Sequence, residues 1–147
     1  MKVMNPVQLD KVLYTARATA EGGRDGRSAT DDGKLDVIVA PPKELGGSGN
    51  GTNPEQLFAA GFAACFHNAF RIVARKARQD VDGSTVTAEV AFGPVGGGPG
   101  YGLAVNLIVD VPGVDRAVAE QLVSTADKVC PYSNATRGNI AISHTIA

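Results

Sequence analysis

One long helix, predicted over residues 53–79, constrains the fold of this chain more than any other segment. Its start is well marked. Asn53 can cap the first turn, Pro54 suits a position that needs no N–H donor, and Gln56 stands where a capping box places its return partner. Residues 57–66 carry no polar side chain except one thiol, which predicts burial on every side. We therefore expect the helix to start in the core and to leave it along the surface.

The other segments predict strands in blocks, not in strict alternation with helices. Three strands before the helix form an antiparallel meander, over 10–21, 27–31 and 35–39. Two longer strands, a second helix and a last strand follow it, over 84–92, 101–111, 114–129 and 139–146. The order βββ-α-ββ-α-β predicts an α+β fold with a mainly antiparallel sheet. A length of 147 residues predicts a single domain, 1–147.

Charge and composition exclude several classes of partner. With 14 basic and 15 acidic residues the net charge is −1, which provides no field to hold nucleic acid or an anionic membrane. No apolar run approaches the roughly 20 residues of a membrane span, and the polar start has no signal peptide. We therefore expect a cytoplasmic protein, with no nucleic-acid partner and no membrane partner. Two cysteines in a reducing compartment favour redox chemistry over a structural disulfide.

The two cysteines have different expected roles. Cys65 lies in the apolar half of the long helix, where burial should raise its pKa, so it needs a positive charge from elsewhere. Cys130 lies at the end of the second helix, because Pro131 cannot continue the hydrogen-bond ladder. The helix dipole disfavours a thiolate there. This asymmetry predicts Cys65 as the nucleophile and Cys130 as the resolving partner.

Two other interpretations of the cysteines stay open. Both could be small buried hydrophobic residues that never meet. A zinc site built from Cys65, His67, Cys130 and His144 is possible by residue type. It is disfavoured because residues two apart on a helix point to different faces and the other spacings match no compact motif. We therefore predict no metal. His67 is expected on a solvated helix face and His144 in a partly buried strand position, with no catalytic role for either.

Three stretches carry a family resemblance: GGRDG at 22–26, GTNPEQLFAAGFAACF at 51–66 and VCPYSNATRGNI at 129–140. They resemble the organic hydroperoxide resistance proteins of the Ohr/OsmC superfamily. The resemblance implies an OsmC-like fold in an intertwined homodimer with a buried central helix from each subunit. It implies a thiol peroxidase that protects against oxidative stress by reducing alkyl and fatty-acid hydroperoxides to alcohols. Electrons would come from dihydrolipoyl groups on lipoylated proteins, without a metal, flavin or haem cofactor.

The resemblance also implies roles for four residues. Cys65 would be the peroxidatic cysteine, oxidised to a sulfenic acid, and Cys130 would then close a disulfide with it. Arg24 and Glu55 would form a charge pair beside the thiolate, although from the residues alone they read as a turn residue and a first-turn acid. Ten residues of continuous helix place Glu55 about 15 Å from Cys65 along the axis. Unless the helix start is irregular, we expect Glu55 or Arg24 to arrive from the partner subunit.

The substrate side of the prediction rests on phenylalanines near the thiol. Phe58, Phe62 and Phe66 would make an apolar entrance that favours hydroperoxides with a carbon chain, although for any one of them plain core packing is the favoured role. Tyr132 and Asn134 are interpreted as residues that hold the Cys130 loop or as ordinary turn residues. Two other functions remain open: a redox sensor that uses the same disulfide without rapid turnover, and a ligand-binding domain without catalysis.

Overall fold

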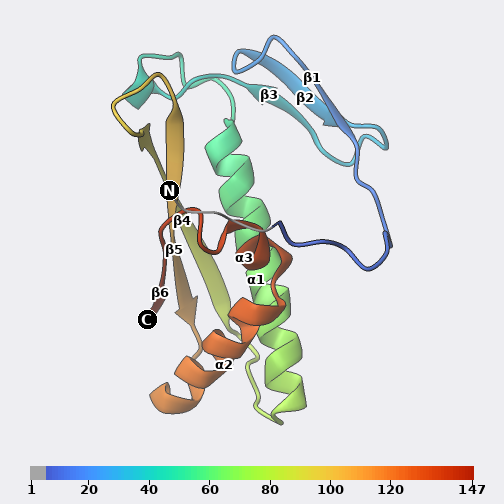
Figure 1. Cartoon of the computed structure of the whole chain (residues 1–147), viewed down its shortest axis with the longest axis vertical. Helices are drawn as coiled ribbons and strands as arrows, with labels where there is room; N and C mark the ends of the chain where they lie inside the picture. Colours follow the sequence, from blue (N-terminus) through green and yellow to red (C-terminus); the bar gives the residue numbers. More distant parts are fainter. Residues whose placement is uncertain (1–5) are drawn as a thin grey trace. The chain divides into compact units, whose positions relative to one another are not determined.

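The computed structural model describes residues 6–147. Along the chain, the helices and strands are β1 (Ala18–Glu21), β2 (Gly26–Thr30), β3 (Asp36–Val39), the 3-10 helix η1 (Lys43–Leu45), α1 (Pro54–Lys76), β4 (Thr85–Pro94), β5 (Tyr101–Asp110), α2 (Arg116–Val129), α3 (Pro131–Thr136) and β6 (Ile142–Ile146) (Figure 1). The chain forms two compact units: the first is Gln8–Leu57, and the second contains Phe58–Ala147. The mixed α+β class is confirmed.

In the first unit, β1, β2 and β3 form the expected antiparallel meander. The first strand is shorter than predicted and begins at Ala18, not at residue 10. The reason is the partner: β2 ends at Thr30, which pairs with Ala18, so no strand lies beside the earlier residues. Glycine is required in the β1–β2 turn, because a Cβ at Gly26 would lie 2.0 Å from a backbone oxygen of the preceding strand.

The start of α1 is built largely as the sequence predicts. The Asn53 side chain accepts the N–H of Gln56 at 2.8 Å, which is an N-cap. The Gln56 side chain does not return to Asn53 as a capping box requires, because its Oε1 accepts the hydroxyl of Thr52 at 2.7 Å. The helix then runs without interruption from Pro54 to Lys76.

The middle of α1 is strongly apolar. By length and composition alone the helix could cross a membrane, although the sequence contains no uninterrupted apolar run of that length. However, Phe62, Phe66 and Phe70 are fully buried in the core, and core helices of soluble proteins meet the same criteria. The prediction that residues 57–66 are buried on every side is wrong for a single chain, since Ala60 and Ala64 are exposed.

In the second unit, β4, β5 and β6 form one sheet with β5 in the centre. β4 and β5 pair antiparallel, but β5 and β6 pair parallel, with Val105 opposite Ile142. A parallel neighbour needs a crossover, and α2 and α3 supply it between these two strands. Three of the four strand pairings in the described chain are antiparallel, so the expectation of mainly antiparallel sheets holds.

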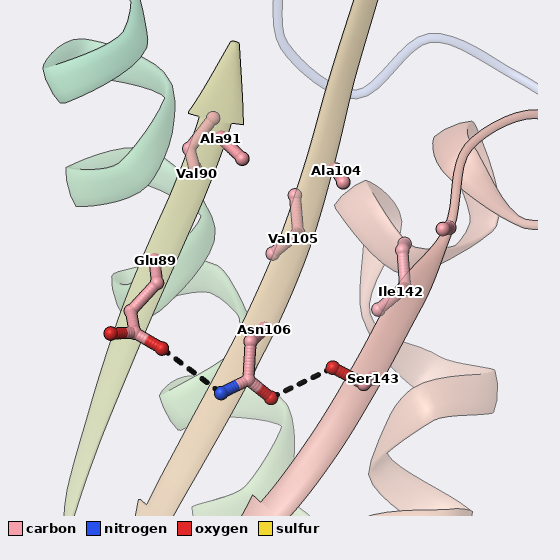
Figure 2. A pocket seen from close by; sticks show the side chains of 9 residues that line it. Glu89, Val90, Ala91, Ala104, Val105, Asn106, Ile142 and Ser143 are labelled. Carbon is pink, nitrogen blue, oxygen red and sulfur yellow. Dashed lines mark hydrogen bonds between the residues drawn. The ribbon is translucent and has the colours of Figure 1, made fainter. Parts of the chain in front are cut away.

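A polar ladder crosses the face of this sheet that is turned away from the core. The Asn106 side chain donates to Glu89 at 3.0 Å and accepts the hydroxyl of Ser143 at 2.8 Å (Figure 2). It also accepts the hydroxyl of Thr145 at 3.1 Å. Glu89, Asn106 and Ser143 are direct cross-strand neighbours. One amide therefore links all three strands and fixes their register.

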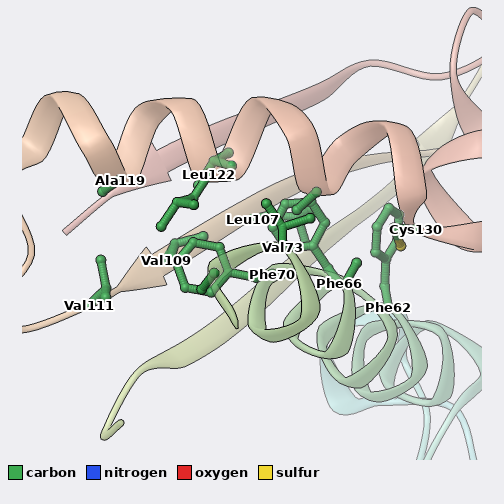
Figure 3. Packing of buried hydrophobic residues seen from close by; sticks show 14 of the residues in the cluster. Phe62, Phe66, Phe70, Val73, Leu107, Val109, Val111, Ala119, Leu122 and Cys130 are labelled. Atoms are coloured by element: carbon green, nitrogen blue, oxygen red, sulfur yellow. The ribbon is translucent and has the colours of Figure 1, made fainter. Parts of the chain in front are cut away.

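The core lies on the opposite face of the sheet. Alternate residues of β5, namely Val105, Leu107 and Val109, pack with buried side chains from α1 and α2 (Figure 3). Those side chains include Phe62, Phe66, Phe70, Ala119, Leu122 and Ala126, and Cys130 belongs to the same cluster. The resolving cysteine expected at the end of α2 is therefore part of the core that holds α1.

The chain does not become a loop after α2. The predicted helix over 114–129 begins at Arg116 and ends at Val129, and a six-residue helix, α3, follows directly from Pro131 to Thr136. The prediction that Pro131 only ends a helix is wrong, because proline also suits the first position of a new helix. Cys130 is the extended residue between the two helices, with φ −65° and ψ 122°.

Candidate active site

The two cysteines meet in the second unit. Cys65 on α1 and Cys130 at the α2–α3 break are free thiols with their sulfur atoms 3.5 Å apart. Cys130 is fully buried, whereas Cys65 is half-buried. The structure thus brings together a thiol with access to solvent and a second thiol shielded behind it. This arrangement excludes the interpretation that the two cysteines never meet.

The environment of Cys65 acts on its thiol in two opposed ways. Burial raises the pKa of Cys65 above its ordinary value, as the sequence predicts. The backbone N–H of Tyr132 donates to the Cys65 sulfur and acts in the opposite direction, because it stabilises the thiolate. This donor is a site feature that the sequence analysis missed. A main-chain N–H leaves no trace in the sequence, although the proline that starts α3 marks where such free donors occur.

The side chain of Tyr132 packs against phenylalanines of α1 beside the thiol pair. Its ring stacks on Phe58 at 5.8 Å and meets the edge of Phe62 at 5.5 Å between ring centroids. Gly61 on α1 makes room for it, since a Cβ there would lie 2.8 Å from the Tyr132 hydroxyl oxygen. A glycine in the middle of an apolar helix is the one sequence signal that could have indicated this close approach.

The three phenylalanines predicted to bind substrate have unequal access. Phe62 and Phe66 are fully buried in the core. Phe58 is half-buried and forms the outer edge of the aromatic cluster with Tyr132 and Phe62. Phe58 is therefore the best placed of the three to contact a bound molecule. The substrate role of all three stays a prediction.

Arg24 and Glu55 form a pair within the first unit. Two hydrogen bonds join the guanidinium to the carboxylate, at 3.0 and 2.7 Å, in the bidentate geometry that the resemblance implies. The hydrogen bonds from Arg24 hold the pKa of Glu55 below its ordinary range, and those to Glu55 raise the pKa of Arg24 further. At neutral pH the pair is therefore an ionised arginine oriented by an ionised glutamate.

The histidines do not gather with the cysteines. His67 is half-buried and its Nε2 lies 3.0 Å from the hydroxyl of Ser84, so the expected solvated position is wrong. His144 packs against the ring of Phe66 and lies 3.4 Å from an Asp127 oxygen; its side chain is 27% exposed, whereas the residue as a whole is exposed, so the expected partial burial holds for the side chain alone. Among residues 6–147, no group of three or more His, Cys, Asp and Glu side chains is arranged to hold a metal ion. The geometry therefore gives no support to the zinc interpretation.

Two pockets elsewhere in the second unit are lined by other residues than the two cysteines. One of about 490 Å³ lies over the polar ladder of the sheet and is lined by residues of β4 and β5 and by Ala141, Ile142 and Ser143 (Figure 2). Another of about 370 Å³ is lined by α2 residues with Arg137, His144 and Ile146. Neither lining contains a cysteine.

A paired thiol site on this α+β fold defines a class of protein. A family model described as OsmC-like protein matches residues 47–145. The chain belongs to the OsmC-like family.

Similar proteins identify a group within this family. An organic hydroperoxide resistance protein of Xanthomonas axonopodis pv. citri (strain 306) is 51% identical over 140 residues, which cover 94% of this chain and 97% of that protein. The organic hydroperoxide resistance protein OhrB of Bacillus subtilis (strain 168) is 42% identical over 88% of this chain and 95% of its own. The crystal structure of an organic hydroperoxide resistance protein from Elizabethkingia anophelis superposes with a TM-score of 0.88 at 47% identity, covering 93% of this chain and 98% of that one. Within its family, this chain is therefore grouped with the organic hydroperoxide resistance proteins.

Proposed function

We propose that this protein defends the cell against organic hydroperoxides by reducing them to alcohols in a thiol-dependent reaction. The observation that carries the proposal is the 3.5 Å approach of the Cys65 and Cys130 sulfurs, in a chain whose relatives are named organic hydroperoxide resistance proteins. A half-buried thiol in front of a buried one suits a reaction in which the first sulfur meets the substrate and the second resolves the product.

The chemistry follows from the two thiols. The Cys65 thiolate attacks the distal oxygen of the hydroperoxide, an S–O bond forms as the O–O bond breaks, and the alkoxide leaves as an alcohol after taking up a proton. Cys65 is then a sulfenic acid. The Cys130 sulfur attacks the Cys65 sulfur, an S–S bond forms and water leaves. A dithiol reopens the disulfide by two exchange steps and is itself oxidised.

The positive charge that Cys65 requires is assigned to Arg24. Its guanidinium would stabilise the thiolate and the charge that develops on the leaving alkoxide. Glu55 would orient that guanidinium through the bidentate pair. We propose that each site is completed in a homodimer, with Arg24 or Glu55 supplied by the partner subunit. A monomeric variant with full activity would contradict this part of the proposal.

The remaining parts of the proposal concern context. The chain acts as a single domain over 1–147 in the cytoplasm, without a metal or organic cofactor. Its reductant is a dithiol of the dihydrolipoyl type, free or carried by a lipoylated protein. An apolar wall that includes Phe58 would favour substrates with a carbon chain over hydrogen peroxide.

The test is consumption of cumene hydroperoxide by the purified protein with dihydrolipoamide, beside the variants Cys65→Ser and Cys130→Ser. We expect multiple turnovers by the unmodified protein, no reaction with Cys65→Ser, and one turnover that ends in a sulfenic acid with Cys130→Ser. Hydrogen peroxide serves as the matched substrate and should react more slowly. If the disulfide forms but no dithiol restores the thiols, the protein is a redox sensor instead. If Cys65→Ser leaves consumption unchanged, the thiol mechanism is wrong.

A further inference from the structure

The break between α2 and α3 interrupts the helical hydrogen bonds at the end of α2, including those of the Asp127 and Lys128 carbonyls. In a continuous helix, the carbonyl of Asp127 would accept the N–H of residue 131, and that of Lys128 would accept the N–H of residue 132. Residue 131 is proline and has no N–H. The backbone N–H of Tyr132 acts instead on Cys65, where its hydrogen bonding lowers the pKa of the thiol. Both carbonyls therefore need other donors.

Two side chains from beyond the break supply those donors. The Arg137 guanidinium donates to the main-chain oxygen of Asp127. The Asn134 amide donates to the main-chain oxygen of Lys128 at 3.2 Å. Side chains thus replace the helical bonds of these two carbonyls. An arginine here also places a positive charge at the negative end of the α2 dipole.

The same side chains are tied to one another. Arg137 also donates to the Asp127 carboxylate at 3.2 Å and to the Asn134 side-chain oxygen at 2.8 Å. The other carboxylate oxygen of Asp127 lies 3.4 Å from Nε2 of His144 on β6. We call Asp127, Asn134 and Arg137 the α2–α3 clasp. It connects the last turn of α2, the helix α3 and the neighbouring strand, and it encloses the short segment that contains Cys130 and Tyr132.

We propose that Arg137 and Asn134 are positioning residues of the thiol reaction, which hold the Cys130 sulfur and the Tyr132 N–H against Cys65 by satisfying the two carbonyls at the end of α2. The part that concerns disulfide closure rests on the proposed function, whereas the part that concerns the Tyr132 donor does not. Without the clasp, these carbonyls compete for the Tyr132 N–H or for water. In either case the segment leaves the geometry in which both groups face Cys65.

The experiment uses Arg137→Lys. A lysine keeps the charge but cannot donate in the three fixed directions of a guanidinium. Arg116→Lys is the matched control, because Arg116 lies at the other end of α2 in an exposed pair with Glu120 at 3.3 Å. Two quantities are measured: the pH dependence of Cys65 alkylation by iodoacetamide, and the rate of disulfide closure after one equivalent of cumene hydroperoxide. The sulfenic acid is trapped with dimedone, and melting temperatures are compared.

For Arg137→Lys we expect a higher pKa for Cys65 and closure slower by about tenfold, with a dimedone adduct on Cys65 and an unchanged melting temperature. Arg116→Lys should match the unmodified protein. Asn134→Asp, which loses the donor to Lys128 but keeps an acceptor for Arg137, should change both quantities in the same direction. The proposal is overturned if Arg137→Lys and Asn134→Asp leave both quantities unchanged, or if Arg116→Lys changes them equally. If the unmodified protein does not reduce hydroperoxide, the proposed function fails and the alkylation measurement alone decides the role of the clasp.

Discussion

Gly61 and Tyr132 are fitted to each other: a Cβ on Gly61 would lie 2.8 Å from the Tyr132 hydroxyl oxygen and 3.2 Å from its ring. The ring can therefore lie close to α1 only because residue 61 has no side chain. The main chain of the same tyrosine donates to the Cys65 sulfur. The absence of a side chain at Gly61 thus affects the position of the Tyr132 ring and, through it, of the Tyr132 main chain.

Gly61→Ala should displace Tyr132 and slow disulfide closure by about tenfold, because a small shift at a reacting pair is costly. The helix itself gains up to about 1 kcal/mol in propensity, so the melting temperature should not fall in parallel. Stopped-flow measurement of thiol loss after one equivalent of hydroperoxide checks this. Adding Tyr132→Phe removes the closest atom and should restore part of the rate. Closure at the unmodified rate in Gly61→Ala would show that the fit has no functional consequence.

Arg24→Lys should lower kcat/KM for cumene hydroperoxide by about a hundredfold if Arg24 supplies the positive charge at Cys65. The first unit contains a matched control. Arg27 forms a bidentate pair with Asp36 at 2.7 and 2.6 Å, and Arg27→Lys should leave the kinetics unchanged. Steady-state assays of both variants with dihydrolipoamide make the comparison. Equal losses would indicate a structural effect on this unit, and no loss in Arg24→Lys would remove it from the site.

Phe58→Ala and Phe66→Ala should separate substrate binding from stability. Phe66 is fully buried, so its truncation should destabilise the protein by about 3–5 kcal/mol. Phe58 is half-buried beside Tyr132, so its truncation should raise KM for cumene hydroperoxide while costing less stability. Urea unfolding measures the loss of stability, and steady-state kinetics with cumene hydroperoxide and with hydrogen peroxide measure the change in KM. A Phe58→Ala variant with unchanged KM for the organic substrate would exclude the predicted role.

His67 should make stability depend on pH. Burial, and then the charge of Arg71, lower the pKa of His67 in the folded protein. The unfolded chain therefore takes up this proton first, near the ordinary pKa of about 6.5, so this contribution to stability is complete above that pH and decreases as the pH falls below it. Urea unfolding across this range should show the decrease, and His67→Gln should reduce it. An identical slope in His67→Gln would contradict the prediction.

The long helix and its cap could be predicted because several local signals agree over Asn53 and Pro54. The different environments of the cysteines could be predicted in part, because burial and a helix end distinguish Cys65 from Cys130. Their sulfur atoms lie 3.5 Å apart, as the pairing that the resemblance implies requires, and the disulfide itself stays a prediction. The bidentate pair of Arg24 and Glu55 also follows from the resemblance alone. No periodicity connects residues so far apart in the sequence.

Other features could not be predicted for physical reasons. Alternating side chains show which face of β6 is buried, but they do not show its direction, so its parallel pairing with β5 was not foreseen. Alternation over 10–21 likewise does not show whether a partner strand exists for its first half. Pro131 ends one helix and begins another, and only the end was expected from its sequence position. The bond from the Tyr132 N–H to sulfur depends on the break itself.

The parallel pairing of β6 has a consequence for the order of folding. β4 and β5 are neighbours in sequence and can form a hairpin early, whereas Ile142 pairs with Val105 only after the intervening chain has folded back as α2 and α3. We therefore expect the β4–β5 hairpin to form before β6 completes the sheet. Until α2 has packed on α1, Cys65 and Cys130 are separate thiols, and they become a pair only when that packing forms.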